Sequence, residues 1–220
     1  TLAIIVPVLN EGAALTQGLQ ALQPLRARGA ELLVVDGGST DGSAAAAAPL
    51  ADQAPAAPRG RAAQMNAGSC ATRADTLLFL HADTQLPPDA DVLVAQALRA
   101  GHAWGRFDVH IHGRHPLLPM VAALMNARSR ITGIATGDQA MFVRRTVFNA
   151  VGGFAPQPLM EDIDLSRRLR RVSAPACLKA RVTTSGRRWD QHGLWRTIVL
   201  MWRLRAAYFG GASPQMLAGQ

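Results

Sequence analysis

Three groups of acidic residues along the chain have the types and positions that catalysis needs. Asp36 and Asp83 each come at the end of an apolar, strand-like run, and Glu161 with Asp162 opens a helical pattern. A carboxylate at the end of a buried strand can accept hydrogen bonds from a nucleotide or bind a hard cation such as Mg²⁺. A carboxylate where a loop meets a helix is a usual position for a general base. One cleft could therefore hold a nucleotide, a metal ion and a catalytic base.

Each group also has an explanation without chemistry. Asp36 could complete a capped turn with residues 37–41, and Asp83 could lie in an acidic turn before Pro87. The acids around Asp162 precede a run of arginines, which is the order that a helix dipole favours. No Gly-x-Gly-x-x-Gly turn follows the first apolar run, and this argues against a dinucleotide-binding fold. From these groups alone, both interpretations are open.

The elements that must position these residues alternate between strands and helices in the first half of the chain. Continuous apolar runs predict buried strands at residues 2–8, 32–35 and 76–80. Spacing and composition predict helices at about 15–25, from 43, at 61–71 and at 87–100. This alternation predicts a parallel sheet with helices on both faces.

The second half is less regular. Residues 104–111 alternate like a strand with one exposed face, and residues 139–143 predict a short strand. Helices are predicted at 117–131, 162–171 and 193–209. The segment 194–209 mixes tryptophan, aliphatic and arginine side chains. It could lie on a membrane surface, pack on the body of the domain, or bind a second subunit in a homodimer.

Bulk composition limits the class of protein. The chain has 220 residues, of which 49% are hydrophobic, and this suits one large domain with a substantial core. The net charge of +8 comes almost entirely from arginine and favours anionic partners: nucleotide phosphates, nucleic acid or an acidic membrane surface. The two cysteines make no disulfide framework, and neither a signal peptide nor an apolar run of about 20 residues is visible. We expect a cytoplasmic protein, or one bound peripherally to a membrane.

Five segments, in order and at matching spacing, resemble glycosyltransferase family 2. They are residues 6–11, 35–43, the segment around Asp83, residues 152–154 and residues 161–169. The resemblance implies the GT-A fold, an α/β fold with a mostly parallel central sheet and helices on both faces. It implies one domain over residues 1–220, with a nucleotide-binding half at 1–100 and an acceptor half at 101–220 that ends in an amphipathic helix. Further segments are similar to the arsenosugar-biosynthesis (radical-SAM/selenodomain-associated) subgroup, at residues 60–68, 137–143 and 186–189.

The resemblance also implies roles for individual positions. The nucleotide pocket would be lined by Pro7, Asn10, Glu11, Asp36, Arg61, Asn66 and Gly68. The acceptor site would include Gly137, Asp138, Gln139, Arg188 and Trp189. Asp83 and His192 would bind the metal ion, although His81 replaces the first carboxylate of the family's Asp-x-Asp motif. Asp162 would be the catalytic base, with Glu161 as its neighbour.

These roles describe an inverting glycosyltransferase. It would move a sugar from a nucleotide-diphosphate donor to an acceptor hydroxyl, with Mg²⁺ or Mn²⁺ at Asp83 and proton removal by Asp162. Arg61 would stabilise charge on the leaving diphosphate. The donor nucleotide, the sugar and the acceptor are not encoded by these motifs.

Two other functions are compatible with parts of this sequence. A sugar nucleotidylyltransferase would need a glycine-rich turn with arginine after the first strand, where Asn10 and Glu11 stand instead. A non-catalytic protein that binds nucleic acid or another anion is suggested by the charge. However, no stacking platform or recognition motif is apparent, so we expect no nucleic-acid partner.

Overall fold

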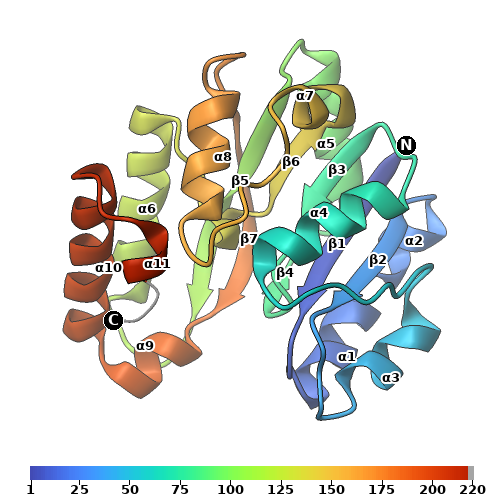
Figure 1. Cartoon of the computed structure of the whole chain (residues 1–220), viewed down its shortest axis with the longest axis horizontal. Helices are drawn as coiled ribbons and strands as arrows, with labels where there is room; N and C mark the ends of the chain where they lie inside the picture. Colours follow the sequence, from blue (N-terminus) through green and yellow to red (C-terminus); the bar gives the residue numbers. More distant parts are fainter. Residues whose placement is uncertain (218–220) are drawn as a thin grey trace.

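A computed structural model describes residues 1–217, apart from the side chains of Ala13, Arg188 and His192. Its centre is a seven-stranded sheet with the order β2-β1-β3-β6-β5-β7-β4, covered by helices on both faces (Figure 1). The strands that run in one direction are β1 (Leu2–Val8), β2 (Glu31–Asp36), β3 (Thr76–Phe79), β5 (Trp104–His112) and β7 (Ala176–Ser185). The strands that run the other way are β6 (Met141–Arg144) and β4 (Thr84–Gln85). The predicted α/β class with a mostly parallel sheet is confirmed.

The predicted helices are present, several with shorter bounds. The first half contains α1 (Ala13–Ala21), α2 (Gln23–Ala27), α3 (Ser43–Ala47), α4 (Arg61–Ala71) and α5 (Ala90–Arg99). The second half contains α6 (Leu118–Thr132), α7 (Arg145–Ala150), α8 (Glu161–Leu169), α9 (Arg187–His192), α10 (Leu194–Phe209) and α11 (Pro214–Leu217). Of these, α7, α9 and α11 were not predicted. The single helix expected at 15–25 is interrupted at Leu22. Pro24 then lies in the first turn of α2, where a missing N–H costs nothing.

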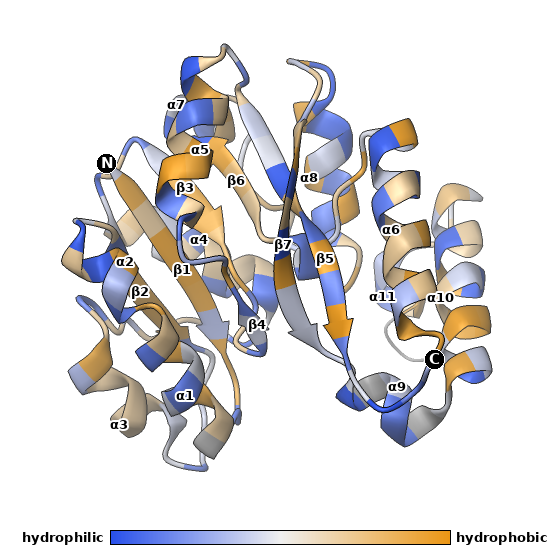
Figure 2. Cartoon of the chain, turned by 180° about the vertical axis from the view of Figure 1, so that it is seen from behind, coloured by the Kyte–Doolittle hydropathy of each residue, from blue (hydrophilic) through white to orange (hydrophobic). Residues whose placement is uncertain are grey.

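Alternation along β1 divides the core between the two faces of the sheet. Ile4, Val6 and Val8 pack in one cluster with side chains of α1, α5 and α6. Ala3 and Ile5 pack in the other, with side chains of α4, α7 and α8. Successive side chains of a strand point to opposite faces, so a continuous apolar run is what a strand buried on both sides requires. The hydropathy colouring of Figure 2 shows β1 as an apolar band through the domain.

The prediction that residues 104–111 expose one face is wrong. β5 is buried along nearly its whole length, and Arg106 is 0% exposed. Its guanidinium forms an ion pair with Asp108, which also accepts a hydrogen bond from Arg130 at 2.6 Å. The polar residues that suggested an exposed face instead satisfy one another inside the protein.

Two further differences concern strands. The predicted strand at 139–143 begins at Met141, because Gln139 belongs to a 3₁₀ turn, Gly137–Gln139. β7 was not predicted, since its half-buried sequence carries Lys179 and Arg181 and lacks a clear apolar face. Among the described residues, no helix is both long enough and apolar enough to cross a bilayer.

Candidate active site

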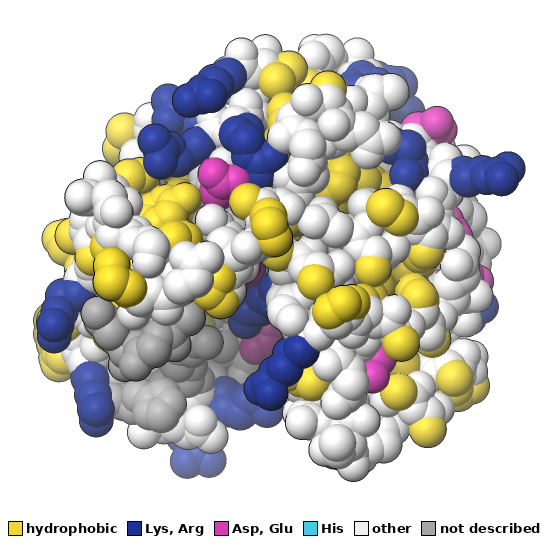
Figure 3. Space-filling view, in the orientation of Figure 1, with side chains coloured by type: hydrophobic (Ala, Val, Ile, Leu, Met, Phe, Trp, Pro, Cys, Tyr) yellow, Lys and Arg dark blue, Asp and Glu magenta, His cyan; other side chains and the backbone are white. Residues whose placement is uncertain are grey.

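The carboxyl ends of β1, β3, β5 and β7 meet at a cleft with a volume of about 430 Å³. This is the edge at which open α/β sheets bind ligands. Figure 3 shows the hollow below the centre of the view, with acidic and basic side chains inside it. One wall comes from the segments after β1 and β3 and the start of α4. The other comes from the 3₁₀ turn, α8, α9 and α10.

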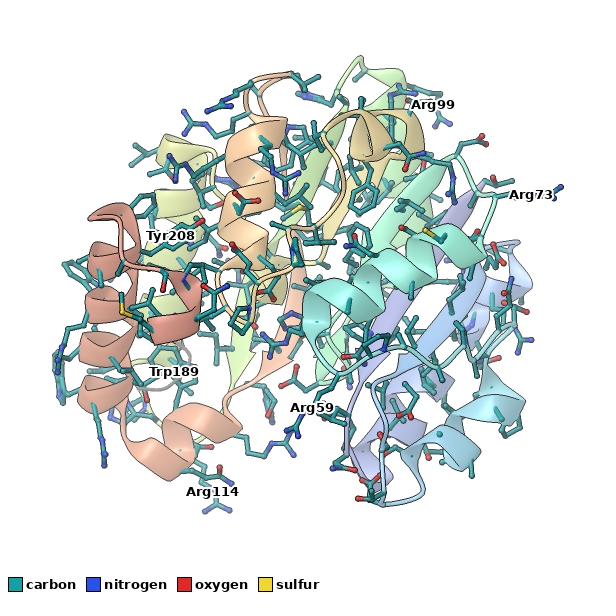
Figure 4. The ribbon with its side chains drawn as sticks, in the orientation of Figure 1. Arg59, Arg73, Arg99, Arg114, Trp189 and Tyr208 are labelled. Carbon is teal, nitrogen blue, oxygen red and sulfur yellow. The ribbon has the colours of Figure 1, made fainter. Side chains whose placement is uncertain are left out.

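The structure brings most of the predicted site residues together. Those that line the cleft are Pro7, Glu11, Arg61, Asp83, Gly137, Asp138, Glu161, Asp162 and Trp189. Those that lie outside its lining are Asn10, Asp36, Asn66, Gly68 and Gln139. The predicted roles of Arg188 and His192 fall on side chains outside the described part of the structure. Figure 4 labels Trp189, on the α9 side of the site, and Arg59, which extends from the loop before α4.

Asp36 and Asn10 join two loops beside the cleft. The Asp36 carboxylate accepts hydrogen bonds from the N–H groups of Gly38 and Ser39, both at 3.0 Å. Partial burial raises the pKa of Asp36, but these hydrogen bonds and one from the Ser39 hydroxyl outweigh it and hold the pKa below its usual value. Asn10 accepts a hydrogen bond from the Thr40 N–H at 2.9 Å. The capped turn that was the plainer interpretation of Asp36 is therefore present.

Asn66, Gly68 and Gln139 hold the elements around the cleft in place. Asn66 makes two hydrogen bonds of 2.9 Å with the backbone of Phe154 and so ties α4 to the loop before α8. Gly68 lets α4 approach β1 closely, since a Cβ there would lie 2.5 Å from the Ile5 side chain. Gln139 is fully buried and caps its own 3₁₀ turn through Thr136.

Opposite charges gather at the end of the cleft nearest β1. The Arg187 guanidinium lies 4.0 Å from the Glu11 carboxylate. Burial and then the nearby Asp83 carboxylate raise the pKa of Glu11, while Arg187 and Arg61 lower it less strongly. Two carboxylates that repel one another beside two arginines can bind a cation and an anion together, as a metal-bound diphosphate requires.

The carboxylates of the cleft do not form a complete metal cage among the described residues. In the described part of the chain, no group of three or more His, Cys, Asp or Glu side chains is arranged to hold a metal ion. A complete protein cage is not needed for Mg²⁺, which proteins usually bind through one or two carboxylates together with substrate phosphates. Asp83 is exposed at the cleft and Glu11 is its electrostatic neighbour, so the residues present fit that mode.

His81 fills the position between the two ends of the cleft. Its Nδ1 lies 3.3 Å from an Asp138 carboxylate oxygen. Its ring packs on the backbone of Gly137, where a Cβ would come within 2.2 Å of Nε2. Only glycine allows this approach. His81 therefore positions the 3₁₀ turn as well as lining the cleft.

Asp162 is held in a defined orientation at the start of α8. One carboxylate oxygen accepts a hydrogen bond from the Gly137 N–H at 2.7 Å, and the other accepts one from the Ile163 N–H at 2.7 Å. Both donors come from the backbone, so side-chain motion does not disturb them. A carboxylate fixed in this way at a cleft wall can accept a proton from a bound hydroxyl.

Most of the sequence matches a known protein family. Residues 3–152 match the profile of a family described as Glycosyl transferase family 2, which is more than half of the chain. The chain belongs to glycosyl transferase family 2. No curated protein matches its sequence.

Solved structures that resemble this family 2 chain share its fold. The mannosyltransferase PcManGT from Pyrobaculum calidifontis, with GDP-Man and Mn²⁺, is 21% identical, with a TM-score of 0.63 over 94% of this chain and 60% of its own. Glucosyl-3-phosphoglycerate synthase from Mycobacterium tuberculosis, with Mn²⁺, UDP and phosphoglyceric acid, is 19% identical, with a TM-score of 0.62 over 84% and 69%. S. aureus TarS 1–349, with UDP-GlcNAc, is 16% identical, with a TM-score of 0.62 over 84% and 58%. The chain spans 58–69% of these three structures, and the likeness confirms the GT-A fold.

Several residues that line the cleft of this family 2 chain were not singled out as site residues in the sequence. They are Thr136, Thr184, Gln191 and Arg205. His81 and Arg187 also line the cleft, and the sequence marks both, because His81 lies in the motif around Asp83 and Arg187 lies in the segment 186–189. Thr184 and Arg205 come from β7 and α10, and no local pattern in the sequence marks them as functional.

Glu161 is the most buried acid of the cleft, with 5% of its surface exposed. Burial, followed by repulsion from Asp162, raises its pKa above the ordinary value of 4.5. The folded state therefore disfavours the charged form. Below pH 4.5 this preference does not lower the free energy of unfolding, because Glu161 is neutral in both the folded and the unfolded state. The destabilisation appears as pH rises through the raised pKa.

Glu161→Gln should consequently stabilise the protein at neutral pH and leave its stability unchanged at a pH below 4.5. The substitution removes the charge whose burial is unfavourable. Denaturant unfolding at both pH values measures the difference in unfolding free energy between wild type and variant. Because the other titrating groups are the same in both proteins, their contributions cancel in this difference. A variant that is less stable than wild type at neutral pH would contradict this account of Glu161.

Proposed function

We propose that this chain transfers a sugar from a nucleotide-diphosphate donor to an acceptor hydroxyl with inversion at the anomeric carbon. The observation that carries the proposal is the arrangement of one cleft. Asp83 lies on the wall formed after β3, and Asp162 lies on the facing wall at the start of α8. Membership of glycosyl transferase family 2 supports the same activity.

The donor belongs at the β1 end of the cleft. Pro7 and Glu11 would contact the nucleotide, and Arg61 and Arg187 are the cations available to the diphosphate. The similar structures named above were solved with UDP, GDP-Man or UDP-GlcNAc, which supports a nucleotide-sugar donor. Asp36 and Asn10 would act by shaping the loops beside the nucleotide.

A divalent ion, Mg²⁺ or Mn²⁺, would be held at Asp83 together with the donor diphosphate. When bound, it supplies positive charge that stabilises the leaving diphosphate. Two of the similar structures contain Mn²⁺, which supports this cofactor. His192 stays a prediction as a second ligand.

Asp162 would remove the proton from the acceptor hydroxyl as that oxygen forms its bond to the anomeric carbon. The bond from that carbon to the diphosphate breaks on the opposite face, which inverts the configuration. The backbone hydrogen bonds to Asp162 keep its carboxylate aimed while the proton moves. Gly137 and Asp138 border the same space, so the acceptor would lie against the 3₁₀ turn.

A thermal-shift screen with UDP-, GDP- and dTDP-sugars, with and without Mn²⁺, tests the donor and the metal together. One nucleotide class should raise the melting temperature, and more so with Mn²⁺. A ligand at about 100 times its Kd adds about 2.7 kcal/mol of stability. Asp83→Ala should lose the part of this rise in melting temperature that depends on Mn²⁺.

Asp89→Ala is the matched control, because Asp89 is exposed and lies outside the cleft lining. An Mn²⁺ response in Asp83→Ala equal to that of wild type would remove Asp83 from the metal site. A lack of response to every nucleotide sugar would count against the donor proposal and favour a catalytically silent family member.

The outer face of α10 suits a surface contact. Leu194 and Thr197 are buried, while Trp195 and Trp202 are 67% and 73% exposed. Figures 1 and 2 show α10 beside α6, which exposes Leu124 and Ile131. We propose peripheral binding to a membrane, since exposed tryptophan with nearby arginine is typical of helices that lie on lipid.

Intact protein should therefore float with vesicles that contain anionic lipid, and Trp202→Ser should float less. Size-exclusion chromatography in the absence of lipid addresses the alternative, a homodimer through the same face. A dimer that does not float would contradict the membrane proposal.

Three further expectations stay predictions. They are the arsenosugar subgroup, the single domain and the cytoplasmic location.

A further inference from the structure

Two arginines near Asp162, one in the cleft lining and one behind it, form no ion pair among the described residues. Arg128 comes from α6 and Arg205 from α10, and Arg205 lines the cleft beside Asp138 and Asp162. Within residues 1–217, neither guanidinium forms an ion pair with a carboxylate. Arg128 Nε and Nη2 are buried and, among the described groups, have no hydrogen-bond partner.

This arrangement is energetically unfavourable for the protein alone. Burial, followed by repulsion from Arg205, lowers the pKa of Arg128 to about 10. Burial also lowers the pKa of Arg205, although Asp162 and Asp138 partly oppose this. Cations removed from water are normally paired and hydrogen-bonded. Arg106, which is fully buried and also has an unpaired Nε, differs from Arg128 in that it forms an ion pair with Asp108.

Asp162 does not complete the missing pairs. Both of its oxygens accept backbone hydrogen bonds, and it influences the two arginines only as a nearby charge. Within residues 1–217 no carboxylate completes these pairs, and a bound anion would do so. A phosphate or a carboxylate offers several acceptor oxygens, which suits the planar fork of donors that a guanidinium presents.

We propose that Arg205, reinforced by the neighbouring charge of Arg128, binds an anionic group of the acceptor substrate, a phosphate or a carboxylate, beside Asp162. This rests on the proposed function, because the side of the base is the side of the acceptor. The acceptor is then a compound that carries both a hydroxyl and an anion. The anion fixes its position on the arginines and presents the hydroxyl to Asp162.

The donor diphosphate does not provide this anion. The cation nearest Glu11 is Arg187, at 4.0 Å, and Arg61 acts on both Glu11 and Glu161. Arg205 instead acts with Asp162 and Asp138. Two separate cationic sites within one cleft match the two substrates of a transferase.

Inorganic phosphate is the probe, titrated by thermal shift at constant ionic strength with chloride as the reference. Phosphate should raise the melting temperature of the wild type, and Arg205→Gln should weaken phosphate binding about 10- to 100-fold. Arg203→Gln, an exposed arginine on the same helix, should bind phosphate like the wild type. Arg187→Gln tests whether phosphate binds at the donor end of the cleft rather than at Arg205.

Arg128→Gln provides a second measurement. Without phosphate, this variant should be more stable than wild type, because it removes a buried unpaired cation, and it should bind phosphate more weakly because the supporting charge is lost. The proposal is overturned if Arg187→Gln abolishes the response and Arg205→Gln keeps it. It is equally overturned if neither phosphate nor acetate stabilises the wild type.

Two further arms identify the source of the anion and separate this proposal from the proposed function. Acetate in place of phosphate tests a carboxylate. Vesicles of phosphatidylcholine with phosphatidic acid, compared with vesicles without it, test a lipid-borne phosphate, whose binding should depend on Arg205. Nucleotide-sugar binding should be unchanged in Arg205→Gln. If wild type binds phosphate through Arg205 but binds no nucleotide sugar, the anion site stands and the transferase activity fails.

Discussion

Asp162→Asn should lower kcat by about 10²–10⁴-fold, the usual contribution of a general base. Through its single carbonyl oxygen, asparagine can accept only one of the two hydrogen bonds that Gly137 and Ile163 donate, so one of these backbone contacts is lost together with the charge. It cannot take a proton from the acceptor. Steady-state kinetics with the donor from the thermal-shift screen measures the loss, and circular dichroism with donor binding confirms an intact site.

Asp164→Asn is the matched control on the same helix. Asp164 faces Arg168 at 2.6 Å and lies outside the cleft lining. Its substitution should leave kcat near the wild-type value. Near-normal transfer by a folded Asp162→Asn protein would show that the base is another residue, and Glu161, its buried neighbour, would be tested next.

Asp108→Ala should destabilise the protein by about 3–5 kcal/mol, because it leaves a fully buried guanidinium without its partner. Arg106 is 0% exposed, and its remaining partners are the backbone carbonyls of Phe107 and Asn126. For a domain of this size the loss corresponds to a melting temperature lower by roughly 6–20 °C. Thermal unfolding followed by circular dichroism measures it.

Two variants separate charge from packing in this prediction. Asp91→Ala breaks the more exposed ion pair with Arg28 and should have a much smaller effect. Arg106→Met combined with Asp108→Leu removes both buried charges and should recover most of the lost stability. If the double variant is less stable than Asp108→Ala, packing rather than the unpaired charge determines the stability of β5.

The strands of the first half could be predicted because burial on both faces leaves a continuous apolar run, as in β1 and β2. β7 could not, since one of its side-chain rows exposes Lys179 and Arg181, the other is only partly buried, and its partner β5 is distant in the sequence. The buried arginine of β5 was misjudged for a related reason. A single sequence shows that Arg106 is charged, but not that its charge is paired with Asp108 inside the protein.

The candidate site follows the same division. Asp83 and Asp162 lie at element ends, where a local pattern marks them, and both line the cleft. Asp36 and Gln139 come from equally clear motifs, yet their side chains bond to their own turns. Arg128 and Arg205 belong to helices whose pattern suggests only packing. Their meeting depends on how α6 and α10 cross the domain, which no local pattern encodes.

The two walls of the cleft differ in where they lie along the chain. The wall around β1, β3 and α4 lies wholly within the family match at residues 3–152. Much of the facing wall, from α8 through β7 and α9 to α10, lies after it. The segment 161–169, which resembles the family and holds the proposed base Asp162, also lies in this wall, so from α8 to α10 only the residues after 169 lie outside both the match and that segment. Exchange of residues 170–217 between relatives is the corresponding engineering route, in which the proposed base would be kept while the rest of the second wall changes.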